Sequence, residues 1–182
     1  MAANLFKYAQ NPKSCLTIAN VKYKNPFFLL ILEMILSASS VEEAKKVIKK
    51  AIEEKDKLII LRAGDNEFNR KMLEYGRFDI LLSVESGVRK DSLKQLDSGL
   101  NHVLAEIAAK NNIAVGVDME EIRKLKKKDK AICLARISQN ISLCRKTKTK
   151  IKIVNIIDKL NSFSLLLSLG ASTMQAEEAV DF

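Results

Sequence analysis

The sequence contains few of the residues on which most enzyme chemistry depends. Its 182 residues include one histidine, three cysteines, six glycines and only 5% aromatic residues. The cysteines, Cys15, Cys133 and Cys144, are widely spaced and form no CxxC pair, so they indicate neither a disulfide framework nor a zinc site. The glycines form neither a GxGxxG nor a Walker loop, and the chain has no GxSxG elbow and no HExxH motif. Any metal centre would have to be built from carboxylates.

Long apolar runs are also lacking. The longest extends from Pro26 to Leu32 and ends at Glu33, well short of the roughly 18 apolar residues of a spanning helix. The N-terminal residues MAANLFKYAQNPKSC have neither the basic start nor the apolar centre of a signal peptide. With 47% hydrophobic and 29% charged residues, we expect a single soluble, globular domain over residues 1–182 that is cytoplasmic and makes no membrane contact.

Positive charge is concentrated in one part of the chain. The formal net charge is +9, and the isoelectric point lies near 9.4. Residues 123–152 hold twelve Lys or Arg against a single acid, Asp129, an excess larger than the net charge of the whole protein. Such a segment is either a solvated lysine-rich face or a surface for a polyanion, and charge alone leaves both interpretations open.

Short apolar segments alternate with segments of helical periodicity along most of the chain. This alternation predicts an α/β fold with a parallel sheet, and right-handed crossovers leave a barrel or a doubly wound sheet as the two architectures. We expect strands near residues 27–36, 57–62, 78–84, 113–117 and 150–156, and helices near residues 41–55, 66–75, 100–110, 129–146 and 165–182, the last interrupted at Gly170.

The helix near residues 100–110 carries the only histidine. Asp97 and Ser98 precede its apolar series and are the expected N-cap residues. His102 is expected on the face opposite the apolar stripe, together with Ala105 and Ala109. Two alanines beside an imidazole would allow close approach of a helix, a partner or a nucleic-acid backbone. The alternative is a face that is merely solvated.

The helix near residues 129–146 has two polar residues within its apolar arc. Arg136 and Asn140 fall between Leu143 and Cys133 on a helical projection. A buried guanidinium costs too much free energy to remain unpaired, so Arg136 needs a carboxylate, backbone carbonyls or an external phosphate. An internal ion pair and a phosphate contact are equally compatible with the pattern.

Four carboxylates lie near the ends of expected strands. Asp79, Glu85, Asp97 and Asp118 could in principle form a carboxylate site. Carboxylates at loop edges are common, however, and nothing else in the sequence indicates a catalytic polypeptide.

Several motifs resemble one known family. GLNHVL at Gly99–Leu104 and KNNIAVG at Lys110–Gly116 closely resemble a segment of the archaeal and eukaryotic ribonuclease P protein component 3 family. AICLARISQNISLCRK at Ala131–Lys146, LSLG at Leu167–Gly170, and Gln175-Ala176 resemble later segments of the same family. The family's opening acidic strand is not recognisable in residues 1–24, so the resemblance implies a (β/α) TIM-barrel-like fold that is shortened or incomplete at its N-terminus.

The resemblance also implies a function and partners. It implies a non-catalytic subunit of the ribonucleoprotein that removes 5′ leaders from precursor tRNA, in which the RNA is the catalyst of an endonuclease reaction. It implies association with RNase P RNA and with protein component 2, as a heterotetramer of two copies each, and only indirect contact with precursor tRNA. Magnesium is expected on the RNA, and this chain is expected to bind no cofactor.

The matched motifs supply the residues expected to contact RNA or to support assembly. They are Asn101, His102, Arg136, Asn140, Arg145 and Lys146, with Arg89, Lys90 and Lys94 in the preceding loop as supporting cations. Arg136 could equally brace the barrel, and His102 could contact component 2. Two competing hypotheses are a metal-dependent phosphoesterase barrel that uses carboxylates, and an RNA-binding barrel outside RNase P.

Overall fold

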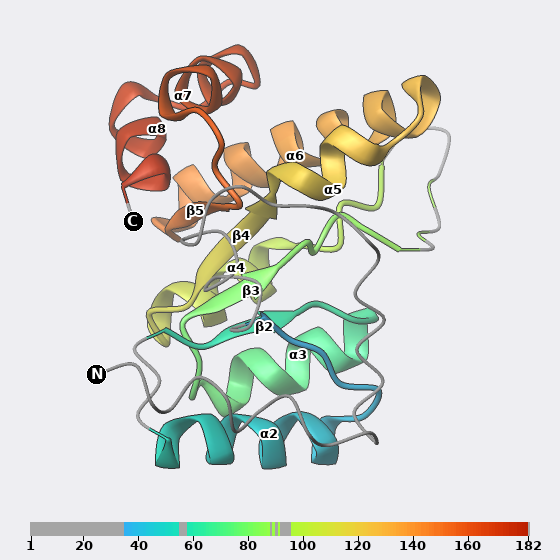
Figure 1. Ribbon diagram of the computed structural model, residues 1–182, viewed down its shortest axis with the longest axis vertical. Coiled ribbons are helices and arrows are strands. Elements are labelled where there is room, and N and C mark those ends of the chain that lie inside the picture. The colour runs from blue at the N-terminus through green and yellow to red at the C-terminus, as the bar shows by residue number, and fades with distance from the viewer. Residues whose placement is uncertain (1–34, 55–57, 88, 90, 92–95, 182) are drawn as a thin grey trace, which may run out of the picture.

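A parallel sheet of five strands organises the structure, a computed structural model that describes residues 35–54, 58–87, 89, 91 and 96–181 (Figure 1). The strands pair in the order β1-β2-β3-β4-β5, and every pair is parallel. Their bounds are β1 Ile35–Leu36, β2 Ile60–Arg62, β3 Ile80–Leu82, β4 Ala114–Asp118 and β5 Ile151–Val154. Most of the expected first strand, residues 27–34, lies outside the described residues.

The strand order distinguishes between the two expected architectures. Strands that are consecutive in sequence are neighbours throughout, which is the winding of a (β/α) barrel. A doubly wound sheet reverses its strand order part-way along, and the described strands do not. Within the described residues β1 and β5 are the sheet edges and do not pair with each other, so this part of the chain forms an open arc. The predicted α/β fold is confirmed.

Seven helices belong to the described part of the chain. In Figure 1, α2 and α3 lie beside β1 and β2 at one end of the sheet and α6 lies toward the other end, with α7 and α8 packed together beyond β5. Because α3 contacts α4 and α4 contacts α6, these helices follow one another over the same face of the sheet. No helix in the described ranges is long and apolar enough to cross a membrane. The bounds are α2 Val41–Glu53, α3 Asn66–Tyr75, α4 His102–Lys110, α5 Met119–Lys124, α6 Lys127–Thr147, α7 Lys159–Ser168 and α8 Thr173–Val180.

Apolar side chains are buried on both faces of the sheet, as a run of β-branched and aliphatic residues predicts. Leu61, Leu81 and Val115 face the helices and belong to the larger core cluster. Ile80 and its neighbours form a smaller cluster on the other face. Each fully buried aliphatic side chain contributes about 1.5–3 kcal/mol. Gly116 keeps the smaller cluster compact, because a Cβ there would lie 2.6 Å from Cγ2 of Ile80.

Local signals set most of the helix boundaries. Ser40 caps α2 by accepting a hydrogen bond from the backbone N–H of Glu43, and Gly76 ends α3 with a left-handed φ of 70°. The start of α2 and the end of α3 therefore agree with the expected ranges. The prediction that Asp97 or Ser98 caps α4 is wrong. Asn101 is the cap, and its side chain accepts from the N–H of Leu104 at 2.8 Å. The left-handed backbone of Gly99 (φ 74°) ends any helical turn before that point.

Two helices differ from the sequence-based expectation. α7 begins at Lys159 rather than near residue 165, because the Asp158 side chain accepts from the N–H of Asn161. α5 was not predicted, since six residues are too few to show a helical period. It follows β4 directly, and the Asp118 side chain caps it by accepting from the N–H groups of Glu120 and Glu121.

Candidate functional site

The cations of residues 123–152 gather mainly at the two ends of α6. With 21 residues, this helix is roughly 30 Å long, so the two groups are well separated. The buried Arg136 lies between them. The exposed members define an N-terminal basic cluster, Arg123, Lys124, Lys126, Lys127 and Lys128, and a C-terminal basic cluster, Arg145, Lys146, Lys148 and Lys150.

The C-terminal basic cluster is positioned by the way α6 ends. Lys148 has a left-handed backbone, and its N–H donates to the carbonyl of Cys144, which stops the helix. Arg145 Nη1 donates to the carbonyl of Gly170 at 3.2 Å, and the residue remains exposed. Partial negative charge at a helix C-terminus stabilises nearby cations. Because of this stabilisation, several exposed cations can be held close together at this end of α6.

The predicted contact residues of α4 lie at its N-terminus. His102 is exposed, and its Nε2 lies 3.2 Å from Oε1 of Glu106, one helical turn further on. Ala105, expected on the same face, is fully buried, and its carbonyl accepts a hydrogen bond from Oγ1 of Thr149. The face is therefore solvated at His102 but packed at Ala105. An RNA or partner contact by Asn101 and His102 stays a prediction.

Arg136 and Asn140 are buried within α6, as their place in the apolar arc predicts. Arg136 Nη2 lies 2.8 Å from Oδ2 of Asp91, and Nη1 donates to the carbonyl of Glu85 at 3.2 Å. Asn140 Nδ2 donates to the carbonyl of Ser98 at 3.1 Å. Of the alternatives left open for Arg136, the internal ion pair is the one present. The two side chains position the loops that follow β3 and precede α4.

Arg89 braces the loop after β3. Its guanidinium donates to Oδ1 of Asn66 at 2.7 Å and to the carbonyls of Gly64, Val84 and Ser86. Four acceptors leave little hydrogen-bonding capacity for a phosphate, so a role as a supporting cation is a weaker expectation than the sequence suggests. Lys90 and Lys94 lie outside the described residues.

A polar network at the carboxyl ends of the strands was not predicted. Arg62 Nη1 lies 3.2 Å from Oε1 of Glu121, whose Oε2 accepts from Oγ of Ser83 at 2.8 Å. Asp118 accepts from Nδ2 of Asn155 at 3.0 Å. Four of these residues end or directly follow an apolar strand: Arg62, Ser83, Asp118 and Asn155. Their positions in the sequence could have predicted the network, because the carboxyl ends of parallel strands meet at one edge of a sheet.

The four carboxylates considered from the sequence do not form one site. Asp79 Oδ2 accepts from the N–H of Ile59, just before β2 and β3 begin, and Asp97 accepts from the N–H of Gly99. Only Glu85 and Asp118 lie near the carboxyl ends of the strands. Within the described ranges, no three His, Cys, Asp or Glu side chains are grouped so that they could hold a metal ion.

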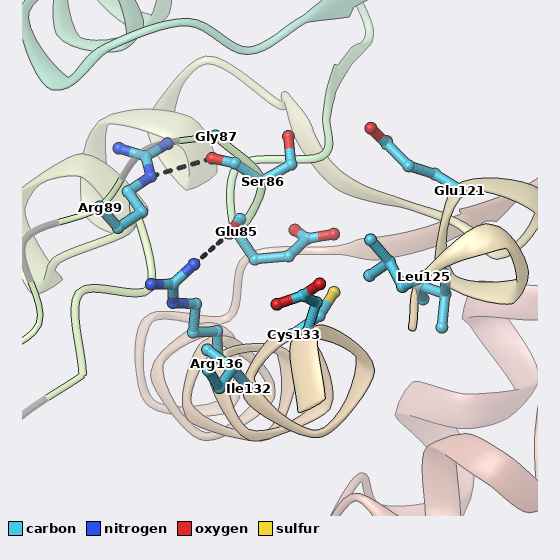
Figure 2. Close-up of a pocket in the computed structure, with 11 residues that line it drawn as sticks. Glu85, Ser86, Gly87, Arg89, Glu121, Leu125, Ile132, Cys133 and Arg136 are labelled. Atoms are coloured by element: carbon cyan, nitrogen blue, oxygen red, sulfur yellow. Dashed lines mark hydrogen bonds between the residues drawn. The ribbon is translucent and has the colours of Figure 1, made fainter. Parts of the chain in front are cut away.

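A pocket of about 400 Å³ opens beside this network (Figure 2). The Glu85 carboxyl points into it, between Glu121, Leu125 and Cys133. Burial raises the pKa of Glu85 to about 7, and the negative charges of Glu121 and Asp118 add to that rise. Burial likewise raises the pKa of the Cys133 thiol to about 12, which excludes a reactive thiolate at neutral pH.

The raised pKa of Glu85 predicts a pH-dependent stability. The folded protein keeps the Glu85 proton up to about pH 7, whereas the unfolded chain releases it near its ordinary value of 4.5. The stabilising contribution is therefore complete below pH 4.5 and is lost as pH rises through about 7. The free energy of unfolding should therefore fall by roughly 3 kcal/mol as the pH rises from 4.5 to about 7. We expect Glu85→Gln to abolish this fall.

Denaturant unfolding of both proteins between pH 4.5 and 8 measures this change. As the pH rises, the variant should become more stable relative to the parent, as measured by the difference between their free energies of unfolding. This difference should level off above about pH 7. Taking the difference removes the contributions of other titrating groups. Parallel pH profiles for the two proteins would contradict the assignment.

Comparison with known proteins identifies relatives of one kind. The chain is 31% identical over 111 residues to ribonuclease P protein component 3 of Methanococcus vannielii, covering 61% of this chain and 45% of that protein. It is 30% identical over 118 residues to the component 3 protein of Methanococcus maripaludis strain S2, covering 65% and 47%. The Methanothermobacter thermautotrophicus protein is 25% identical over 154 residues, covering 81% and 60%. The chain thus spans about half the length of the first two relatives.

Solved structures agree with the fold. A chain in a cryo-EM structure of archaeal ribonuclease P with mature tRNA has a TM-score of 0.64 and 21% identity, covering 81% of this chain and 63% of that chain. A crystal structure of an uncharacterised protein has a TM-score of 0.54 and 8% identity, covering 83% and 44%. At these identities the likeness is one of fold. No family model matches the chain.

Proposed function

Because the chain is a relative of the ribonuclease P protein component 3 family, we propose that it is a non-catalytic protein subunit of a ribonuclease P. In this role it supports RNA-catalysed removal of the 5′ leader from precursor tRNA. The observation that carries the proposal is the sequence relationship to several archaeal component 3 proteins. The exposed cations at both ends of α6 are the feature of this chain that fits an RNA partner.

The proposed interaction with RNA is electrostatic. Exposed lysines and arginines neutralise phosphates and release counterions, which makes binding weaken as salt rises. Such contacts position RNA without reading its bases, and the 5% aromatic content fits a surface with little base stacking. The proposed contact residues are Arg145 and Lys146 in the C-terminal basic cluster, together with Asn101 and His102 on α4. Arg136 and Asn140 support the contact residues of α4 by holding the segment that precedes this helix.

The finer composition of the assembly is also proposed. Component 2 is the proposed protein partner, in a heterotetramer of two copies each, and His102 is a candidate contact with it. Precursor tRNA is contacted only indirectly, and the location is cytoplasmic. The proposed catalytic magnesium is bound by the RNA, so the chain itself needs no cofactor.

Charge reversal in the C-terminal basic cluster tests the RNA contact. We expect Arg145→Glu/Lys146→Glu to weaken binding to RNase P RNA by about tenfold or more and to flatten the salt dependence of log K by roughly 1 to 2 units. Both residues are exposed, so the melting temperature should change little. Filter binding at several salt concentrations gives both quantities.

A matched control separates a local contact from net charge. Lys46→Glu/Lys49→Glu makes the same charge change on the exposed side of α2, where neither lysine has a partner in the described part of the chain. The control should keep most of the affinity and the salt slope. Equal losses in the two variants would mean that only overall charge matters and would contradict a role for this cluster.

Reconstitution tests the proposed function as a whole. We expect the purified chain, added with component 2 to RNase P RNA, to raise precursor-tRNA cleavage at modest magnesium, while the chain alone with Mn²⁺ leaves both precursor tRNA and a generic phosphodiester uncleaved. Turnover by the chain alone would favour the phosphoesterase hypothesis.

A pull-down of the chain followed by RNA sequencing tests the identity of the RNA partner. It should recover mainly RNase P RNA. Enrichment of other RNAs would favour an RNA-binding role outside RNase P.

A further inference from the structure

Glu85 presents a buried acceptor without a donor. The residue is 3% exposed, and its Oε2 has no hydrogen-bond partner among the described residues. Buried polar atoms are nearly always hydrogen-bonded, and an unsatisfied one calls for an explanation. This oxygen belongs to a side chain that lines the pocket and points into it (Figure 2). A ligand that enters the pocket could therefore supply the missing donor.

The walls of the pocket suit an alkyl chain. Ile122, Leu125, Ile132 and Cys133 line it beside Glu85, and the first and fourth are buried. Its volume of about 400 Å³ lies within the roughly 300–1,000 Å³ typical of small-molecule sites. An apolar wall next to a single buried carboxyl is complementary to a chain of methylene groups that ends in a cation.

The remaining charges around Glu85 also favour a cation. Glu121 and Asp129 line the pocket, and Asp129 forms no ion pair within the described ranges. The charge of Arg136 is offset by Asp91. Arg89 lies on the other side of the loop from the Glu85 carboxyl in Figure 2 and is occupied by Asn66 and three carbonyls. Glu121 is likewise paired with Arg62 and Ser83. The acids with spare acceptors among the described pocket residues are therefore Glu85 and Asp129.

We propose that this pocket binds an alkylammonium or alkylguanidinium group, with the charged end at Glu85 and the methylene chain against Leu125 and Ile132. The group comes either from a free polyamine or from a lysine or arginine side chain of a bound polypeptide. A metal ion fits less well, because the described residues offer no group of three ligands and an ion would leave the apolar walls unused.

The cation and a proton compete for Glu85. Binding requires the ionised carboxylate, whose pKa in the empty pocket is raised to about 7 by burial. Between pH 8 and pH 6 the ionised fraction falls by about tenfold, so the affinity should fall by about the same factor. At pH 6 binding should also release close to one proton.

Titration calorimetry on the full chain tests the proposal. The probes are putrescine and agmatine, a blocked Gly-Lys-Gly peptide, and 1,4-butanediol as an uncharged control of similar length. We expect at least one cationic probe to bind, about tenfold more tightly at pH 8 than at pH 6, and 1,4-butanediol not to bind. Titrations at pH 6 in buffers of different ionisation enthalpy measure the released proton. If only putrescine and agmatine bind, the source is a free polyamine, and if only the peptide binds, it is a side chain.

Two variants and one control identify the site. Glu85→Gln should weaken binding at least tenfold at pH 8 and abolish its pH dependence. Asp129→Asn, at an exposed position of the pocket lining, should weaken binding a few-fold and keeps the test available if the first variant fails to fold. Glu53→Gln removes the same charge from exposed α2 and should change nothing. Failure of every cation to bind at pH 8, or unchanged binding in both pocket variants, would overturn the proposal.

Discussion

Replacing Gly99 by alanine should destabilise the protein by about 4 kcal/mol or more. Gly99 has a φ of 74°, which costs an alanine about 1–2 kcal/mol. In addition, its Cβ would lie 1.9 Å from the carbonyl oxygen of Val84 and 2.7 Å from Nη2 of Arg89. Neither atom can yield easily, because the Arg89 guanidinium itself binds that carbonyl. Chemical denaturation of the purified variant measures the loss.

Gly87 is the matched control for this substitution. It has a φ of 85°, and a Cβ there would meet nothing within 4 Å. Gly87→Ala should therefore cost only the backbone contribution, about 1–2 kcal/mol. The difference between the two variants isolates the contact with the loop after β3. Equal destabilisation would show that the close approach at Gly99 is relieved by a small shift and carries little free energy.

Replacing Arg136 by alanine should destabilise the fold by about 3 kcal/mol. The substitution removes a buried side chain and leaves the carbonyl of Glu85 without its donor. It should also raise the pKa of Asp91, which lies below its ordinary value because the backbone N–H of Asp97 and the Arg136 guanidinium stabilise the ionised carboxylate. Thermal melts report the first effect, and NMR titration of Asp91 reports the second.

Arg145→Ala is the control for Arg136→Ala. Arg145 lies on the same helix, is exposed and makes one hydrogen bond, so its removal should cost less than about 1 kcal/mol. A stable Arg136→Ala that nevertheless fails in reconstitution would move Arg136 from a positioning role to a direct one. An Arg136→Ala variant as stable as Arg145→Ala and fully active would remove it from both.

The order and type of most elements could be predicted because they depend on local patterns. α3 agrees with prediction at both ends, since Asp65 and Gly76 are a clear cap and a clear stop. The start of α4 could not be placed from Asp97 and Ser98, because the deciding feature is the left-handed backbone at Gly99. A positive φ leaves no periodic trace in a sequence. The close approach of Gly99 to the carbonyl of Val84, fifteen residues earlier in the chain, is likewise visible only in the fold.

The candidate site was predicted only in part, and the reason is again the range of the interactions. The apolar arc of α6 required partners for Arg136 and Asn140, but it could not say that they are Asp91 and the backbone of Glu85 and Ser98. Those contacts join residues more than forty positions apart. The sequence predicts that Arg136 and Asn140 have hydrogen-bonding partners, whereas only the folded structure shows which residues these are.

α6, with its 21 residues, places the two basic clusters roughly 30 Å apart on one rigid helix. Under the proposed function, each cluster is a separate attachment point for RNA. Once a long RNA is held at one end, the other end searches only a small volume around it, so the two attachments reinforce each other as they do in a bivalent antibody. Removing the charges of one basic cluster should then reduce the affinity for a long RNA by more than that cluster would contribute alone. An oligonucleotide too short to reach across roughly 30 Å should gain nothing from the second cluster. Avidity, rather than the strength of any single contact, would then determine the affinity for a large RNA.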